Sequence, residues 1–145
     1  MIITVSVIAI VYNESTYKRI RRIHSYPADE SYYSAIQYLE RRPNGKYAKE
    51  ATDTLLKYYV TLPSYTIPTV NGKPWPMTRY DNNLIKIKNT KDQVAGSPAE
   101  PALDSLIRAR IDEEYEKASK LNTEEGWKVF DSIVPEEYRG LHLRN

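Results

Sequence analysis

Two stretches of the chain follow one pattern, and this repetition is the strongest constraint on the fold. Each stretch predicts a helix, a short polar joint, a second helix with aromatic side chains, and then a proline followed by a tyrosine. The first stretch spans residues 17–47 and the second spans residues 115–138. Paired helices that recur along a chain bury their apolar faces by packing on their neighbours. The pattern therefore predicts a mainly α fold of two or more antiparallel, repeat-like helical hairpins.

The composition is that of a soluble globular protein with one bias. The chain of 145 residues is 41% hydrophobic and 28% charged, which suits one domain or two small helical subdomains. It contains 13 Tyr and 1 Phe. Because tyrosine packs its ring while its hydroxyl stays in water, this bias favours shallow seams between helices and contact surfaces. The absence of cysteine excludes disulfides, thiolate metal sites and cysteine catalysis.

Charge is distributed unevenly along the chain. Residues 1–97 carry 14 basic and 8 acidic side chains, a balance of +6, within a total net charge of +2. Residues 98–145 carry 7 basic and 11 acidic side chains, a balance of −4. This asymmetry indicates a modest tendency toward self-association or toward docking on a charged partner.

Residues 1–12 form an apolar run, and a basic cluster at residues 18–22 follows it. As a helix the run would span ~18 Å, which is less than the ~30 Å of a bilayer core. An apolar run with a basic flank is typical of a membrane edge, so one interpretation is the end of a membrane anchor. The other is a packed strand or helix, which would make the protein soluble and cytoplasmic. No nucleic acid is expected as a partner, because no aromatic residues interleave with the basic cluster.

Residues 13–61 predict the first helical hairpin region. Pro43, Asn44 and Gly45 predict a turn in which Asn44 or Gly45 is able to adopt a positive φ angle. The helix that follows the turn carries Ala48 and Ala51 at helical spacing. These small side chains allow a neighbouring helix to approach closely.

The segment from Tyr38 to Ala51 reads tyrosine-leucine, a proline turn, tyrosine-alanine and glutamate-alanine. It resembles the joint between helices in tetratricopeptide-like repeats of bacterial (Bacteroidetes-type) envelope or membrane-anchored proteins. The resemblance covers residues 29–59, and residues 122–127 are similar to a phrase from the same type of protein. It implies a helical-repeat domain that binds other proteins, and it indicates no particular ligand.

Residues 62–96 predict an irregular insertion or linker, because Pro63, Pro68, Pro74 and Pro76 interrupt any helix. Within it, Asn71–Gly72 is the preferred two-residue turn of a β-hairpin. The alternating residues 84–88 predict a short, half-buried strand.

Three side chains of this insertion are the candidate partner-binding residues: Trp75, Met77 and Tyr80. Aromatic anchors on an irregular segment are typical of contact surfaces. The alternative interpretation is that Trp75 packs the insertion against the first hairpin.

Residues 97–145 predict the C-terminal hairpin. A capping box at residues 97–100 opens a helix of about six turns, in which Asp104 and Arg108 form an i,i+4 pair. The acidic run at residues 112–116 is interpreted as a solvated face. Thr123 is expected to cap a second helix, which buries Trp127 and Phe130 against the first.

No motif for chemistry occurs in the sequence. It contains no Walker loop, no glycine-rich dinucleotide turn and no zinc-protease motif, and its only histidines, His24 and His142, have no predicted partner. We therefore predict no catalytic, cofactor-binding or metal-binding residues and no cofactor.

Three hypotheses follow for the function. The favoured one is a non-enzymatic helical-repeat scaffold or protein-interaction module, tethered to a membrane if residues 1–12 are an anchor. The alternative is a small enzyme, or an accessory domain of an enzyme, that uses residues 62–96 as a substrate lip. The third is an anchor and spacer with no ligand of its own.

Overall fold

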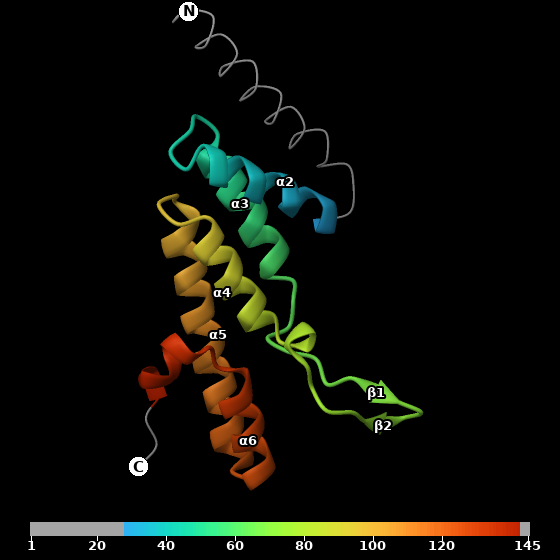
Figure 1. The fold of residues 1–145 in the computed structure, drawn as a ribbon. Coiled ribbons are helices and arrows are strands. Elements are labelled where there is room, and N and C mark those ends of the chain that lie inside the picture. The colour runs from blue at the N-terminus through green and yellow to red at the C-terminus, as the bar shows by residue number, and fades with distance from the viewer. Residues whose placement is uncertain (1–27, 143–145) are drawn as a thin grey trace, which may run out of the picture. The chain divides into compact units, whose positions relative to one another are not determined.

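The structure is a computed structural model that describes residues 28–142, with side chains described for residues 31–140 (Figure 1). It is mainly helical with one small antiparallel sheet, as the sequence predicts. In chain order the elements are α2 (Ala28–Arg41), α3 (Ala48–Tyr59), β1 (Thr69–Val70), β2 (Lys73–Pro74), η1 (Arg79–Asp81), α4 (Asn83–Gln93), α5 (Ala99–Leu121), α6 (Glu124–Ile133) and η2 (Glu136–His142). The predicted helix at the start of the first repeated stretch lies outside the described residues.

The chain packs as two compact units that interleave in sequence. The first unit contains the described residues up to Thr61 together with Lys91–Ala102. The second contains Leu62–Thr90 and the residues from Leu103 onward. Helices α4 and α5 therefore each contribute residues to both units.

The first unit contains the hairpin of α2 and α3. The apolar side of each helix is buried, and its members are Ala35, Ile36, Tyr38, Leu39, Ala48, Ala51, Leu55 and Tyr59. The burial of Ala48 and Ala51 confirms the predicted small-residue face of α3. The buried hydroxyl of Thr52 donates to the carbonyl oxygen of Ala48 at 2.9 Å, so its polar atom does not weaken the packing.

The joint between α2 and α3 is a turn at Pro43–Gly45, as predicted. Among the described residues, positive φ angles occur at Asn71, Gly72, Gly96 and Asn122, so neither Asn44 nor Gly45 uses the positive φ angle that it could adopt. Glycine is needed at position 45 for a different reason, because a Cβ atom there would overlap the Tyr38 hydroxyl. That hydroxyl accepts a hydrogen bond from the Tyr47 backbone N–H at 3.0 Å.

The predicted strand at residues 84–88 is wrong, because these residues belong to α4. The Asn82 side-chain oxygen accepts hydrogen bonds from the backbone N–H groups of Leu84 and Ile85, at 3.1 and 3.3 Å. It thereby caps the first turn of the helix. Leu84 and Ile87 are both buried and lie three residues apart, a spacing that places them on one side of a helix.

The second unit also contains most of α5, with α6 and η2. Buried Leu103, Ile107 and Ile111 recur every four residues along α5, which confirms the predicted long helix. The Thr123 hydroxyl oxygen accepts the Gly126 N–H at 3.1 Å and caps α6 as predicted. Phe130 is buried as expected, whereas Trp127 is only partly covered.

Candidate functional site

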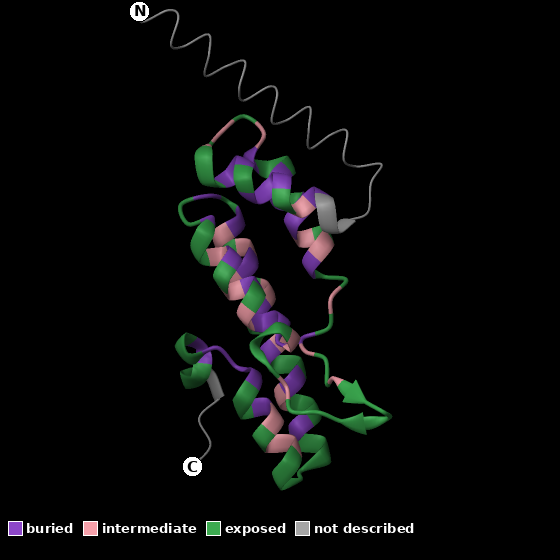
Figure 2. Cartoon of the chain, turned by 45° about the vertical axis from the view of Figure 1, so that its right-hand side comes forward, coloured by how far each residue is buried: buried purple, intermediate pink, exposed green. Residues whose placement is uncertain are grey.

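The candidate partner-binding residues belong to a projecting segment, residues 65–82, which we call the arm. Strand β1 pairs with β2 in the register Thr69↔Pro74 and Val70↔Lys73. The turn between them has φ angles of 53° at Asn71 and 75° at Gly72, the positive values that a two-residue hairpin turn requires. The predicted hairpin is therefore confirmed, and Figure 2 shows both strands in the exposed colour.

The root of the arm is fastened to α6. The Thr66 N–H donates to the Asp81 carbonyl oxygen at 2.8 Å, and Tyr65 forms an isolated antiparallel bridge with Asn82. The buried Asn82 amide nitrogen donates to the carbonyl oxygen of Ile133 at 3.0 Å. A single asparagine thus caps α4 and holds the arm to the end of α6.

Beyond β2 the chain presents its aromatic side chains to solvent. Trp75 is 56% exposed and Tyr80 is 67% exposed, whereas Met77 is partly buried. More than half of the Trp75 side chain is therefore open to solvent. The structure places the three candidates within one short segment of the arm.

Tyr80 is held in place by its neighbours in η1. The Thr78 N–H donates to the Asp81 carboxylate at 2.8 Å, and the Thr78 hydroxyl oxygen accepts the Tyr80 N–H at 3.3 Å. The guanidinium of Arg79 lies 4.9 Å from the centre of the Tyr80 ring and donates to its hydroxyl at 2.9 Å. Because its backbone is capped and its ring lies against the guanidinium of Arg79, Tyr80 has little conformational freedom left.

A groove of about 270 Å³ lies beside the root of the arm. Its walls come from the arm, from the end of α5 and from α6, and they comprise Tyr65, Ile67, Glu114, Lys117, Ala118, Leu121, Thr123, Glu125, Gly126, Val129, Phe130 and Ile133. Most of these side chains are apolar. Two carboxylates and one ammonium group give the groove a net negative charge.

Glu114 is the functional candidate that sequence reasoning missed. The acidic run was expected to face solvent, but Glu114 is only 9% exposed and pairs with Lys117 at 3.1 Å. The available signal was its spacing, since it lies three residues after the buried Ile111 and four before the buried Ala118. A carboxylate on the apolar stripe of a helix is expected to meet a groove or a partner.

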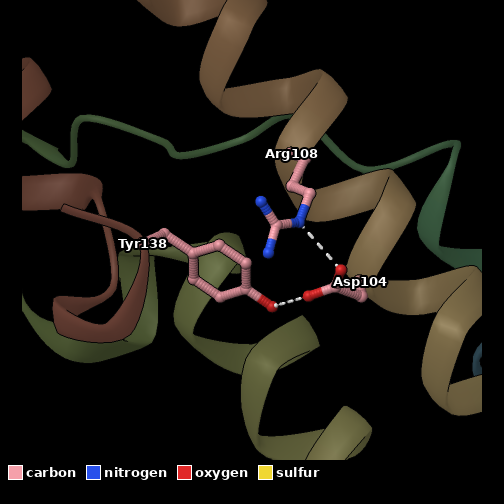
Figure 3. A network of polar contacts seen from close by, with 3 residues as sticks. All are labelled: Asp104, Arg108 and Tyr138. Carbon is pink, nitrogen blue, oxygen red and sulfur yellow. Dashed lines mark hydrogen bonds and ion pairs between the residues drawn. The ribbon is translucent and has the colours of Figure 1, made fainter. Parts of the chain in front are cut away.

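A polar network fastens η2 to α5 (Figure 3). The Tyr138 hydroxyl donates to one oxygen of the Asp104 carboxylate at 2.6 Å, and Arg108 Nε donates to the other at 2.8 Å. These interactions with Asp104 raise the pKa of Arg108 above its usual value. The predicted Asp104–Arg108 pair is confirmed, and Tyr138 makes it a tertiary contact as well as a contact within one helix.

The part of the chain that the structure describes holds no group of three potential metal ligands. Within the same residues, no helix is long and apolar enough to cross a membrane. The apolar run at residues 1–12, the basic cluster at residues 18–22 and the side chains of His24 and His142 lie outside this part.

Comparison with models of protein families gives no match, and neither do comparisons with curated proteins and with solved structures. The resemblance to tetratricopeptide-like repeats therefore stays a prediction.

Proposed function

We propose that this protein is a non-enzymatic helical scaffold that binds another protein through Trp75, Met77 and Tyr80. The observation that carries the proposal is the exposure of large apolar side chains on the arm, at Trp75 and Tyr80 above all. Apolar side chains that gather on one exposed segment mark interaction sites, and tryptophan and tyrosine supply much of the binding energy in protein interfaces. If residues 1–12 are a membrane anchor, the scaffold acts at a membrane surface.

The construction of the arm supports this role. The side chains that would meet the partner lie on an irregular segment, while Asn82 and the Thr78–Asp81 cap fix that segment on helices. Binding residues on loops that a rigid scaffold positions are a common arrangement. Arg79 adds a cation beside Tyr80, which favours a partner surface with acidic groups.

The test compares alanine variants of the full chain in affinity capture from the native host, with the membrane fraction retained. We expect Trp75→Ala and Tyr80→Ala each to weaken capture about 30-fold, the loss typical of an interface hot spot. The melting temperature should stay the same, because both side chains are exposed. Tyr33→Ala is the matched control, since it removes an equally exposed aromatic side chain from the first unit.

Two results would contradict the proposal. If Tyr33→Ala weakens capture and Trp75→Ala does not, the contact surface lies on the tyrosine-rich hairpin of α2 and α3. If Trp75→Ala lowers the melting temperature sharply, the side chain stabilises the fold and is not a contact residue.

A further inference from the structure

The two outer edges of the arm differ in the backbone N–H groups that they can offer to another strand. Pro74 ends β2, and Trp75 and Pro76 follow it. Among these three residues only Trp75 has a backbone N–H, because Pro74 and Pro76 have none. The Trp75 N–H already donates to the Pro68 carbonyl oxygen at 2.8 Å. Lys73, the other residue of β2, pairs with Val70 beside the turn, so its N–H points across the hairpin. The outer edge of this strand therefore has no donor to offer to another strand.

Among the described residues, no other strand pairs with the outer edge of β1. In an antiparallel pair, residues alternate between hydrogen bonding across the pair and pointing their N–H and C=O groups outward. Pro68 bonds across to Trp75, so its neighbour Thr69 points outward. Ile67 lies just before β1. Because Thr66 donates across the arm to Asp81 and Pro68 accepts from Trp75, the same alternation turns Ile67 outward. This edge thus presents a donor and an acceptor at Ile67 and again at Thr69.

We propose that the β1 edge pairs with the β1 edge of a second copy of this chain, antiparallel, across a two-fold axis at Pro68. In this register Ile67 exchanges hydrogen bonds with Thr69 of the second copy, and Thr69 exchanges them with Ile67 of the second copy. The edge is self-complementary because both outward positions carry an N–H and a carbonyl group. The proposal is independent of the partner surface, which is formed by residues that follow β2.

Charge and apolar surface support a second copy as the occupant. The register sets Val70 opposite Thr66 of the second copy, so the tip of each arm reaches the root of the other. The tip carries Lys73, and residues 66–80 contain no acidic side chain. The groove at the root is mostly apolar, and it keeps a net negative charge because Glu114 and Glu125 outnumber Lys117. The cationic tip of one copy therefore complements the anionic groove of the other.

The exposed side chains in and just before β1, and the lack of donors along β2, agree with a closed dimer. Ile67 is 50% exposed and Val70 is 47% exposed, an apolar surface that an unpaired edge strand usually avoids. An arm with two open edges could add copies without limit. Because only the β1 edge has free donors, pairing across it ends at two copies.

The first test is the oligomeric state of the full chain by sedimentation equilibrium, comparing Thr69→Pro with Thr69→Val. The wild-type chain should be a dimer at high concentration. Thr69→Pro removes half of the hydrogen bonds between copies and should raise the dimer Kd about 30-fold or more, at roughly 1 kcal/mol for each bond lost. Thr69→Val keeps the N–H and should dimerise as the wild type does. A wild-type chain that stays monomeric, or a Thr69→Pro variant that dimerises normally, would overturn the proposal.

A second test determines the register by disulfide cross-linking. Because the chain has no native cysteine, an introduced cysteine is its only thiol. Residues that face each other without mutual hydrogen bonds lie about 4.5 Å apart between Cα atoms, which a disulfide can bridge. Pro68→Cys should therefore give a covalent dimer rapidly under mild oxidation. Val70→Cys, on the same exposed strand but away from the axis, should cross-link far more slowly. Equal rates for the two variants would refute the register and the proposal with it.

Discussion

At the scale of single residues, Tyr38 and Gly45 show how one side chain restricts which residue type can occupy another position. The Tyr38 ring is buried, and its hydroxyl occupies the space beside Gly45 in order to accept the Tyr47 N–H. Glycine is required there by close approach and not by its backbone angle. The sequence motif predicts the turn correctly but cannot show this contact, since Tyr38 reaches the turn from inside the preceding helix.

The contact predicts a specific coupling between the two residues. Gly45→Ala should destabilise the fold by about 1–3 kcal/mol, because the new Cβ atom would overlap the Tyr38 hydroxyl and crowd Arg42. In a Tyr38→Phe background the same change should cost less, since the hydroxyl is gone. Urea denaturation of the four chains measures the coupling. Gly140→Ala is the control, because nothing lies within 4 Å of a Cβ atom there. If the losses in the free energy of unfolding from the two single substitutions add up to the loss in the double variant, the clash is absent.

Tyr32 is the residue at which stability should depend on alkaline pH. It stacks on Tyr58 with ring centres 4.1 Å apart, and burial, a side-chain hydrogen bond with Tyr33 and the adjacent Tyr58 raise its pKa. The folded chain therefore keeps this hydroxyl protonated at a pH where the unfolded chain ionises it. The stabilisation is complete below pH 10.0, the usual pKa of tyrosine, and is lost as the pH rises further.

Tyr32→Phe tests this dependence. The ring stack remains, but the ionisable group is removed. We expect the free energy of unfolding to fall less steeply with pH in the variant than in the wild type once the pH exceeds about 10. Urea denaturation at a series of pH values measures both slopes. Parallel slopes would mean that Tyr32 ionises in the folded chain as readily as in the unfolded one.

At the scale of elements, α4 shows why a local pattern was misleading. Leu84, Ile85 and Ile87 fit a short alternating strand almost as well as they fit one side of a helix. The outcome is decided by Asn82, which supplies an N-cap to α4 and at the same time bonds to Ile133, 51 residues further along. The capping oxygen is visible in the sequence, but the distant carbonyl group that orients the side chain is not.

Asn82→Ala should therefore destabilise the protein by about 2–3 kcal/mol, because it removes the cap of α4 and the buried bond to Ile133 together. Asn89→Ala, at an exposed position of the same helix, is the control and should change stability by less than about 0.5 kcal/mol. Thermal unfolding followed by circular dichroism measures both variants. A neutral Asn82→Ala would show that the arm and α6 hold without this residue.

At the scale of the whole molecule, local signals predicted the elements but not their grouping. The mainly α class, the hairpin turn at Asn71–Gly72 and the long helix α5 follow from spacing and capping within short windows. The exposed candidates Trp75 and Tyr80 were recognised by residue type. The groove was not, because its walls come from residues 65–67 and 114–133 and are joined only by tertiary contacts. The same holds for the recruitment of Lys91–Ala102 to the first unit.

This interleaving predicts how fragments of the chain behave. A fragment that ends at Thr61 lacks Lys91–Ala102, so α2 and α3 should lose part of their protection from hydrogen exchange. A fragment that ends at Ala102 contains all described residues of the first unit and should keep that protection. If both fragments protect α2 and α3 equally well, Lys91–Ala102 does not stabilise the hairpin.

The contrasting positions of the two tryptophans give the molecule a built-in pair of optical reporters. Trp75 stands in solvent on the arm, whereas Trp127 lies edge-on to Tyr115 with ring centres 5.5 Å apart. A soluble quencher such as acrylamide should therefore extinguish the fluorescence of Trp75 far more readily than that of Trp127. Replacing Trp127 by phenylalanine leaves Trp75 as the single emitter, which reports on the arm. Replacing Trp75 by phenylalanine leaves Trp127, which reports on the seam between α5 and α6.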